Sequence, residues 1–500
     1  LIKSTSNFTS NFKFNFFRGS ITVHTMSEDY LEKLYKIIDQ KRGTYFDVLK
    51  EAVSIRSETG DQSETMKIIS WAETKLRQLG AATTLQDVGA IIVDGKKFKL
   101  PPVLIADIKS DASKTTLLVY GHLDVRPTNA SKGSIVSTED YNLVEENGVL
   151  FGKGVTDSKG PLLCWFNAIE AFREHGSELP VNLRFVIEAM KESGSFGLME
   201  YISNNKGYLF KNVSYICISD STCLFTTKPV ITFGGRGCCR FTITVEGGKS
   251  DLHSGVHGGM VSEPMTDLVS LLCNLTNNKG EILVPNFRDN VEEVTPDEEK
   301  AYHRLSFDVS AFKSATGIEK LLHKEDKKRL LMHRSRFPSL SIHGIDTGDS
   351  EEDAIPAKVT ASFTIRIVPN QTPQEVFHKV QVYLMYIFNK SQSPNRMTIE
   401  MPVAIPPWVA KPNDANYKSA SKAIQRVYKQ EPDLIREGSS IPIVSELQAI
   451  SGKSVLLLPV GSSEHSILKN RDRIDVKTFM DGTKVVSTYM YELSLQKKVK

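Results

Sequence analysis

Four segments of the sequence each carry a potential metal ligand at or just after the end of a predicted β-strand. The segments are LLVYGHLD, FGKGVTDSKG, FVIEAMKESGS and YICISD, and their candidate ligands are His122 with Asp124, Asp157, Glu192 and Asp220. In open α/β sheets, ligands bind beyond the carboxyl ends of the strands. One imidazole and several carboxylates at such an edge suit a two-metal hydrolytic centre, which needs nitrogen and oxygen ligands and a carboxylate shared between the ions.

The residue before Glu192 does not fit this chemistry. A two-metal hydrolytic centre would place its proton-accepting carboxylate there, whereas this chain has Lys191. A lysine accepts a proton only when it is neutral, and loss of a general base typically lowers the rate by about 10²–10⁴. Two nearby dications would lower the pKa of Lys191, so a neutral lysine that acts as the base is an alternative. Asp124, two residues after His122, is expected to orient the imidazole ring.

The elements that must position these residues alternate between short apolar runs and helical stretches. TTLLVYG, VNLRFVIEAM, VSYICISD and KSVLLLPVG are predicted strands that are apolar nearly throughout, and GPLLCWFNAIEAFREHG is a predicted helix. Strands of this kind are covered on both faces. The alternation predicts an α/β fold, with a mixed, mostly parallel sheet and helices on both faces.

Residues 232–404 have a different pattern, which predicts an inserted α+β domain. CCRFTITVEGG and VTASFTIRIVPN alternate with period two, as strands with one solvent-facing side do. The helical stretches GGMVSEPMTDLVSLLCNL and TPQEVFHKVQVYLMYIFNK would cover the other side, and the charged segment Asp297–Lys328 would be an elaboration of this domain. The catalytic domain would then comprise 26–231 and 405–500.

Residues 1–25 contain no acidic residue, and we expect them to be an unstructured leader, with a helix beginning at Met26. A transit peptide, which their composition resembles, is the alternative. A net charge of +3 over 500 residues gives no reason to expect binding to nucleic acid or to a membrane surface. The six cysteines follow no disulfide-framework or metal-binding spacing, which predicts free thiols and a cytoplasmic protein.

The motifs resemble those of the cytosolic non-specific dipeptidase and carnosinase family of dimetal peptidases. The resemblance runs from Met26 to the C-terminus and is carried by GHLDVRP, FGKGVTDSKGP, MKESGS, CISDS, DLHSGVHGG, MHRSRFPSLSIHGI, FTIRIVPN, IREGSSIP and LLLPVGS. It implies a dimetal catalytic domain that uses zinc or manganese and an inserted lid domain that forms a homodimer. It also implies hydrolysis of dipeptides by a metal-bridging hydroxide.

The resemblance also implies roles for the candidate ligands. His122 and Glu192 would each hold one metal, Asp157 would bridge the two ions, Asp220 would lie opposite Glu192, and Asp124 would orient His122.

Further roles would belong to residues of the second domain and the C-terminal part. His253, in DLHSG, would stabilise the oxyanion in the partner subunit's site, and Arg366 and Ser440 would grip the substrate. Two other substrate positions differ from the family, with Asp353 in place of Thr and Val403 in place of His.

Three further departures concern the metal centre and the substrate loop. Lys191 takes the place of the general-base Glu, and Ser439 replaces a Gly beside Ser440. Where the family has a metal-binding His, ungapped alignment gives Leu468. A shifted loop would bring His465 to that place instead.

These departures predict a family member whose hydrolytic activity is weak or lost. One alternative is an active metallodipeptidase that uses neutral Lys191 or another base, with His465 as a ligand. Another is a non-catalytic pseudoenzyme that binds peptides or pairs with an active paralogue. A nucleotide or nucleic-acid binder, prompted by GGRGCCR, has little support because this run fits no phosphate-loop spacing and precedes a strand.

Overall fold

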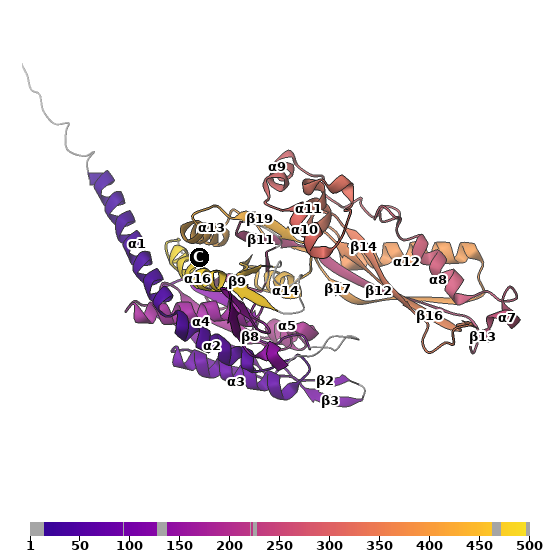
Figure 1. Cartoon of the computed structure of the whole chain (residues 1–500), viewed down its shortest axis with the longest axis horizontal. Helices are drawn as coiled ribbons and strands as arrows, with labels where there is room; N and C mark the ends of the chain where they lie inside the picture. Colours follow the sequence, from indigo (N-terminus) through magenta and orange to yellow (C-terminus); the bar gives the residue numbers. More distant parts are fainter. Residues whose placement is uncertain are drawn as a thin grey trace, which may run out of the picture.

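The structure is a computed structural model that describes residues 15–93, 95–127, 138–220, 222–223, 228–462 and 472–496. Figure 1 shows two parts that lie end to end, a larger α/β domain and an elongated smaller domain. The larger domain contains the N-terminal and C-terminal portions of the chain, and the middle portion forms the smaller one. The inserted-domain architecture predicted from the sequence is therefore confirmed.

The larger domain is built on a mixed sheet. Its strands are β1 (Ala82–Gln86), β4 (Val103–Ile108), β5 (Thr116–His122), β8 (Asn182–Glu188), β9 (Val213–Ile218), β11 (Val230–Gly235), β18 (Trp408–Val409), β19 (Asp433–Glu437) and β20 (Ser454–Leu457). Their order is β1-β4-β8-β5-β9-β20-β11-β18, with β19 paired to β11. The central strands β8, β5, β9 and β20 are parallel, so their carboxyl ends meet at one edge.

Helices cover both faces of this sheet because its central strands are apolar on both sides. One face packs against α1 (Asn15–Gln40), α2 (Arg42–Ser54), α3 (Gln62–Gln78), α4 (Lys159–Glu174), α13 (Ala415–Tyr428) and α16 (Val476–Ser494). The other packs against α5 (Leu198–Asn204), α6 (Lys206–Leu209) and α14 (Pro442–Ser451). In β5, Leu117 and Val119 belong to the first core and Leu118 and Tyr120 to the second.

Short strands lie outside the large sheet. They are the hairpin β2 (Ala90–Val93) and β3 (Lys96–Lys99), the three-stranded group β6 (Val144–Glu146), β7 (Val149–Phe151) and β22 (Arg473–Asp475), and the pair β10 (Thr222–Cys223) and β21 (Gly461–Ser462). Single 3-10 turns occur at η1 (Thr138–Tyr141), η2 (Lys191–Ser193) and η3 (His323–Glu325).

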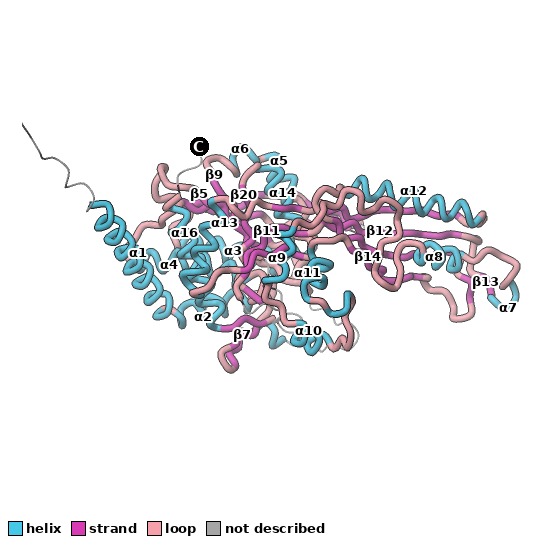
Figure 2. The backbone as a smooth tube through the Cα atoms, turned by 90° about the horizontal axis from the view of Figure 1, so that it is seen from above, coloured by secondary structure: helices cyan, strands magenta, loops and turns pink. Residues whose placement is uncertain are grey.

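The smaller domain has a four-stranded antiparallel sheet in the order β14 (Ser339–Asp346), β16 (Lys358–Ile367), β12 (Gly237–Glu246) and β17 (Arg396–Ile405). Helices α8 (Pro264–Cys273) and α12 (Pro373–Ser391) share its hydrophobic core. In this core the rings of Phe241 and Phe363 stack with 4.8 Å between their centroids. Figure 2 shows that these strands and α12 extend away from the larger domain. The tip of the domain holds β13 (Leu252–His253), β15 (Ala354–Ile355) and α7 (Ser254–His257).

The chain passes from the sheet of the larger domain to the sheet of the smaller domain at Arg236. This is slightly later than the domain boundary predicted after residue 231. Residues Val230–Gly235 stay with the large sheet because they pair in parallel with β19, and β12 begins at Gly237. The chain returns to the large sheet at Trp408, which pairs with Gly235.

The charged segment forms helices α9 (Pro296–Arg304), α10 (Val309–Thr316) and α11 (Lys327–Ser335). We expected this elaboration to belong to the inserted domain. Instead, Tyr302, Leu331 and Met332 are buried together with Val230 of β11 and Ile435 of β19. The helices therefore pack on the edge of the larger domain, because their apolar side chains cover that edge.

Helix α1 begins at Asn15, well before Met26. The expectation of an unstructured leader is therefore wrong for residues 15–25, where no proline interrupts the helix. Residues 1–14 lie outside the described part of the chain. Among the described residues, no helix is both long enough and apolar enough to cross a membrane. Five described cysteines are free thiols: Cys164, Cys217, Cys238, Cys239 and Cys273.

Candidate functional site

The carboxyl ends of the central strands bring most of the predicted ligands together. His122 ends β5, and Asp220 lies two residues beyond the end of β9. Glu192 does not end β8 as predicted, because that strand stops at Glu188 and Glu192 lies in the 3-10 turn η2. Asp157 does not end a strand of the large sheet either. It lies in the turn between β7 and α4, where Gly154 has a φ of +81° and prevents the strand from continuing.

His122 is held between two buried carboxylates. Its Nδ1 lies 3.2 Å from Oδ1 of Asp124, as predicted for an orienting residue, and its Nε2 lies 3.1 Å from Oδ1 of Asp220. Burial and the ammonium of Lys191 lower the pKa of His122, but Asp220 and Asp124 outweigh them and raise it to about 10. Each ring nitrogen of His122 therefore lies within hydrogen-bonding distance of a carboxylate oxygen.

Lys191 projects its ammonium group into the same cluster. Its Nζ lies 2.9 Å from Oε1 of Glu192 and 3.3 Å from Oδ1 of Asp220. The other carboxylate oxygen of Glu192 accepts a hydrogen bond from Nε of Arg126 at 2.5 Å. The carboxylates that would each face a metal ion are therefore already paired with protein cations.

Electrostatics keep these groups charged. Burial lowers the pKa of Lys191, but the carboxylates of Asp220, Glu192 and Asp157 outweigh burial and raise it above its usual value. Burial raises the pKa of Glu192, but Lys191 and Arg126 lower it to about 2. The neutral lysine that an active centre would need is therefore disfavoured in this arrangement.

The fit of these residues to metal ions differs between the two predicted positions. Asp220 Oδ2 is buried and has no hydrogen-bond partner among the described residues, so its lone pairs are open to a cation. Imidazole and carboxylate donors suit zinc or manganese, and a cation held by His122, Asp157 and Asp220 fits this donor chemistry. The second position does not fit, because both carboxylate oxygens of Glu192 are already paired, one with Lys191 and the other with Arg126.

The described residues contain no group of three or more His, Cys, Asp or Glu side chains spaced to hold a metal ion as they stand. In this geometry His122 contacts Asp220 directly, and Lys191 Nζ contacts both Glu192 and Asp220. The two-metal ligand set stays a prediction. His465 and Leu468, the two candidates for the last ligand position, lie outside the described residues.

Asp124 orients His122, as the sequence predicted, and it also accepts hydrogen bonds from the backbone of the turn that follows β8. Its Oδ2 accepts a hydrogen bond from the backbone N–H of Glu192 at 2.8 Å, and its Oδ1 accepts one from the N–H of Lys191 at 3.2 Å. This fully buried carboxylate therefore fixes both the imidazole of His122 and the turn that carries Lys191 and Glu192.

Three neighbouring residues were missed by sequence reasoning. Glu188 accepts hydrogen bonds from the hydroxyls of Tyr120 at 2.5 Å and Ser195 at 2.7 Å, which tie the same turn to β5. Asp472 accepts from the N–H of Gly154 at 2.9 Å, and after burial it is the largest cause that raises the pKa of Asp157. Arg126, which pairs with Glu192, lies in GHLDVRP. The sequence signal for Arg126 was its place in that motif, whereas Glu188 and Asp472 had none.

The predicted substrate residues lie in two separate places, the boundary between the domains and the tip of the smaller domain. Arg366 on β16 donates from Nη1 to Oγ of Ser440 at 2.9 Å, so this pair spans the two domains. His253 and Asp353 instead lie at the tip of the smaller domain, where the N–H of Ser254 donates to the carbonyl of Asp353 at 3.0 Å. This tip lies at the opposite end of the molecule from β9 and α4 of the larger domain (Figure 1). A single chain therefore does not bring His253 to His122.

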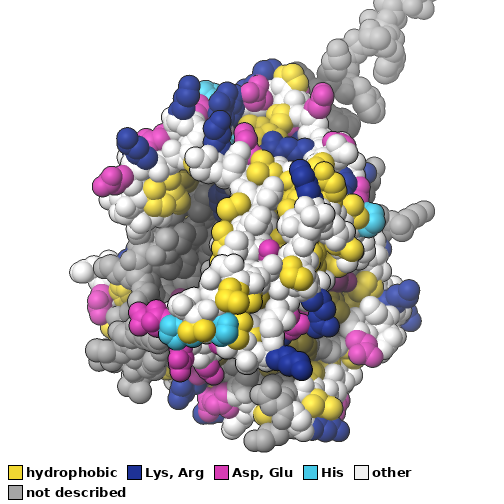
Figure 3. Space-filling model, turned by 90° about the vertical axis from the view of Figure 1, so that its right-hand side faces the viewer, with side chains coloured by type: hydrophobic (Ala, Val, Ile, Leu, Met, Phe, Trp, Pro, Cys, Tyr) yellow, Lys and Arg dark blue, Asp and Glu magenta, His cyan; other side chains and the backbone are white. Residues whose placement is uncertain are grey.

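The space-filling view of this end shows histidine side chains beside hydrophobic and acidic ones (Figure 3). His253 is exposed and His257 is half-buried, and Val256 and Met260 beside them are 63% and 78% accessible. Nδ1 of His253 accepts a hydrogen bond from the N–H of Gly255 at 3.1 Å, so a neutral ring carries its proton on Nε2. The tip thus presents a hydrogen-bond donor to the outside.

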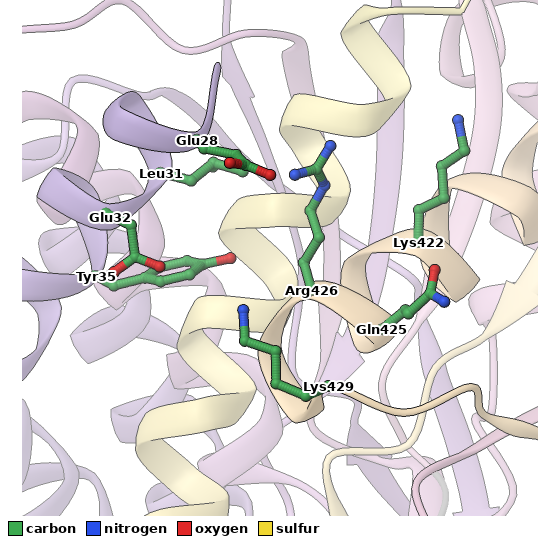
Figure 4. Close-up of a pocket in the computed structure, with 8 residues that line it drawn as sticks. All are labelled: Glu28, Leu31, Glu32, Tyr35, Lys422, Gln425, Arg426 and Lys429. Atoms are coloured by element: carbon green, nitrogen blue, oxygen red, sulfur yellow. The ribbon is translucent and has the colours of Figure 1, made fainter. Parts of the chain in front are cut away.

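A hollow of about 560 Å³ lies on the opposite side of the larger domain, between α1 and the C-terminal end of α13 (Figure 4). Glu32 and Tyr35 of α1 face Arg426 and Lys429 across it. None of the predicted site residues lines this hollow.

Comparison with known proteins places this chain in a family. Residues 118–492 match the sequence model of peptidase family M20/M25/M40. The Beta-Ala-His dipeptidase of Mus musculus is 38% identical over 475 residues, covering 93% of this chain and 96% of the relative. The Cys-Gly metallodipeptidase of Schizosaccharomyces pombe is 39% identical over 471 residues, covering 93% and 98%.

Solved structures show the same relationship. Human carnosine dipeptidase 1 superposes with a TM-score of 0.84 at 37% identity, covering 93% of this chain and 99% of that one. The dipeptidase Dug1p of Saccharomyces cerevisiae gives the same TM-score, identity and coverage. The chain therefore belongs to peptidase family M20/M25/M40, whose members with this degree of similarity are metal-dependent dipeptidases.

Proposed function

We propose that this protein binds a dipeptide or similar small peptide at a centre with one metal ion, and that it hydrolyses the peptide slowly or not at all. The single observation that carries this proposal is the position of Lys191. Its ammonium contacts Glu192 and Asp220, at the position where the family places its general base. A protonated lysine has no lone pair with which to remove a proton from water.

The metal would be held by His122, Asp157 and Asp220, with zinc or manganese as the ion. When bound, such an ion polarises a peptide carbonyl and lowers the pKa of water. Asp124 orients the imidazole, and Lys191 supplies the positive charge that a second ion would otherwise bring to Glu192. The peptide would be oriented by Arg366 and Ser440, whose contact spans the two domains.

The experiment that tests this proposal combines metal analysis with a cleavage assay. The full-length protein is stripped with a chelator, equilibrated with Zn²⁺ or Mn²⁺ and analysed for bound metal. The same samples are assayed with a panel that includes β-Ala-His and Cys-Gly, the dipeptides named in the relatives. We expect one ion per chain and turnover far below the usual enzyme range of about 1–10³ per second. Two ions per chain together with turnover in that range would refute the proposal.

We also propose that the protein forms a homodimer through its smaller domain, or a heterodimer with an active paralogue. The exposed His253 supports this, because its Nδ1 is bonded to the N–H of Gly255 and leaves Nε2 of the exposed ring for a partner's site. In a heterodimer, this chain would supply His253 to a partner that retains its general base. Co-expression with an active relative and measurement of the relative's activity with and without His253→Ala test this role.

The proposed location is the cytoplasm. Five described cysteines, four of them buried, are free thiols, which is usual in a reducing compartment. Fractionation of cells that express the chain with a C-terminal tag tests the location.

A further inference from the structure

The segment Gly234-Gly235-Arg236-Gly237 joins the two domains and allows very close backbone approach. A Cβ atom on Gly235 would lie 2.7 Å from Nε1 of Trp408, and one on Gly237 would lie 2.4 Å from the carbonyl oxygen of Ile405. Side chains are therefore excluded on both sides of Arg236. The motif that had prompted a nucleotide-binding reading instead brings one guanidinium group into the domain junction.

Arg236 is buried, and its planar guanidinium group lies within hydrogen-bonding distance of four acceptors. Its Nε donates to the carbonyl of Gly438 at 2.9 Å. Its Nη1 lies 2.9 Å from Oγ of Ser339, 3.2 Å from the carbonyl of Phe337 and 3.3 Å from the carbonyl of His333. These acceptors belong to two different segments, the loop after β19 and the chain that leads from α11 into β14.

The loop after β19 is built around Glu437 and depends on glycine. Oε1 of Glu437 accepts hydrogen bonds from the N–H of Gly438 at 2.7 Å, the N–H of Ser439 at 3.2 Å and Nη2 of Arg334 at 2.6 Å. A Cβ on Gly438 would lie 2.5 Å from the carbonyl oxygen of Arg334. The loop therefore has one position relative to α11, and Arg236 closes it from the other side.

We propose that Arg236 is a positioning residue for peptide recognition, which holds the loop Gly438–Ser440 so that Ser440 meets Arg366 across the domain boundary. The Arg366–Ser440 contact of 2.9 Å joins strand β16 of the smaller domain to this loop of the larger one. Among the described residues, Arg236 forms no hydrogen bond with Arg366 or Ser440, and it acts through the backbone of Gly438. This inference rests on the proposed function, because the pair that it positions is the proposed peptide-binding pair.

Arginine is required at this position because different nitrogens of its rigid, planar guanidinium group reach the two segments. Nε bonds to the loop after β19, and Nη1 bonds to the chain that leads from α11 into β14. A lysine would retain the positive charge but has a single flexible donor group, so it cannot satisfy both segments at once. Arg236→Lys is therefore the informative substitution. Arg396→Lys is the matched control, since Arg396 is on the exposed far end of β17 and its side chain pairs, within the described part of the chain, only with Glu246.

Hydrogen exchange tests the positioning directly and does not depend on peptide binding. The amides of Gly438 and Ser439, both bonded to Glu437, are expected to exchange at least about 10-fold faster in Arg236→Lys than in the wild type. Exchange in β8 should stay unchanged, which separates a local effect from global destabilisation. Unchanged exchange at Gly438 and Ser439 would overturn the inference.

Peptide affinity tests the consequence. Calorimetric titration with β-Ala-His should show about 10-fold weaker binding for Arg236→Lys and for Ser440→Ala, and no change for Arg396→Lys. In the Ser440→Ala background, Arg236→Lys should weaken binding by less than about 2-fold, because both changes act through the same contact. Full additivity would mean that Arg236 does not act through Ser440 and would also overturn the inference.

The two measurements separate the failure of this inference from that of the proposed function. If the wild type binds no dipeptide, the proposed function fails, while the exchange experiment still decides whether Arg236 fixes the loop. If the wild type binds and Ser440→Ala weakens binding but Arg236→Lys does not, only the inference on Arg236 fails.

Discussion

Lys191 and Asp220, which are 29 positions apart in the chain, meet in the cluster with 3.3 Å between Nζ and Oδ1. Because Lys191 also contacts Glu192 at 2.9 Å, its ammonium bridges two carboxylates that would otherwise each face a metal ion. The centre thus contains an internal cation at the position where the resemblance to the family implies a general base. The consequences for activity, assembly and stability can each be measured.

Replacement of Lys191 by glutamate should restore the missing base and free the second metal position. We expect Lys191→Glu together with Leu468→His to raise turnover of β-Ala-His or Cys-Gly by about 10²–10⁴, with bound metal rising from one to two ions per chain. Lys206→Glu, at an exposed position on α6, is the matched charge control. If the double variant gains a second ion but no activity, the substrate pocket has also diverged.

Asp124→Asn keeps the size of the side chain but replaces an acceptor oxygen with a donor. Because both oxygens of this buried carboxylate accept backbone N–H groups, an amide must leave at least one donor unpaired. We expect a loss of about 2–4 kcal/mol in the free energy of unfolding, measured by urea denaturation. Affinity for Zn²⁺ should fall by about 10–100-fold. Asp47→Asn on the exposed side of α2 should change neither quantity.

The outer face of α12 offers a test of dimerisation. Val382, Met385 and Tyr386 follow helical spacing and are 52%, 48% and 61% exposed, so they form an apolar stripe with no partner in the described chain. We expect light scattering to give twice the chain mass for the wild type and one chain mass for Val382→Asp with Tyr386→Asp. Leu495→Asp, at an exposed position just after α16 of the larger domain, is the control. A wild-type monomer, or a double variant that remains dimeric, would contradict this interface.

Glu188 predicts a pH dependence of stability. Burial raises its pKa to about 7, despite the hydrogen bonds from Tyr120 and Ser195, which lower it. Between about pH 4.5 and pH 7 the folded state therefore binds this proton more tightly than the unfolded state. The contribution of Glu188 to stability accordingly falls as pH rises through this window, by about 3 kcal/mol in total.

Glu188→Gln should remove this slope because glutamine stays neutral. It should also make the protein more stable than the wild type at pH 8, while the two should be similar at pH 5. Urea denaturation in the presence of a chelator at pH 5, 6, 7 and 8 measures this difference, with Glu200→Gln as an exposed control. A variant that is less stable than the wild type at pH 8 would show that Glu188 is better tolerated as a carboxylate than its burial implies.

Much of the fold could be read from local patterns. The apolar runs that became β5, β8, β9 and β20 were recognisable because both faces of each strand are buried. The alternation of apolar and polar residues with period two in β12 and β16 likewise indicated that one face of each strand is buried. The placement of α9 to α11 could not be read in this way, because their apolar side chains pack on β11 and β19, which are distant in the sequence.

The site was recognisable in part. His122, Asp124 and Asp220 lie at or just after predicted strand ends, so the rule on ligand placement found them. Asp157 and Glu192 were identified as candidates but placed wrongly, because Gly154 and the turn η2 end the strands earlier than the apolar pattern implies. Glu188 resembled an ordinary strand residue, and only its hydrogen bonds from Tyr120 and Ser195 reveal its role.

The sequence by itself determined which side chains are available to the centre, including the lysine at the position of the base, since residue types are fixed before folding. Only the tertiary structure decided where the ammonium of that lysine goes. Its partners lie on different segments, and the order of the parallel strands β8, β5 and β9 sets the distance between those segments. The same holds for Arg236, because its acceptors come from two segments that meet only where the domains join.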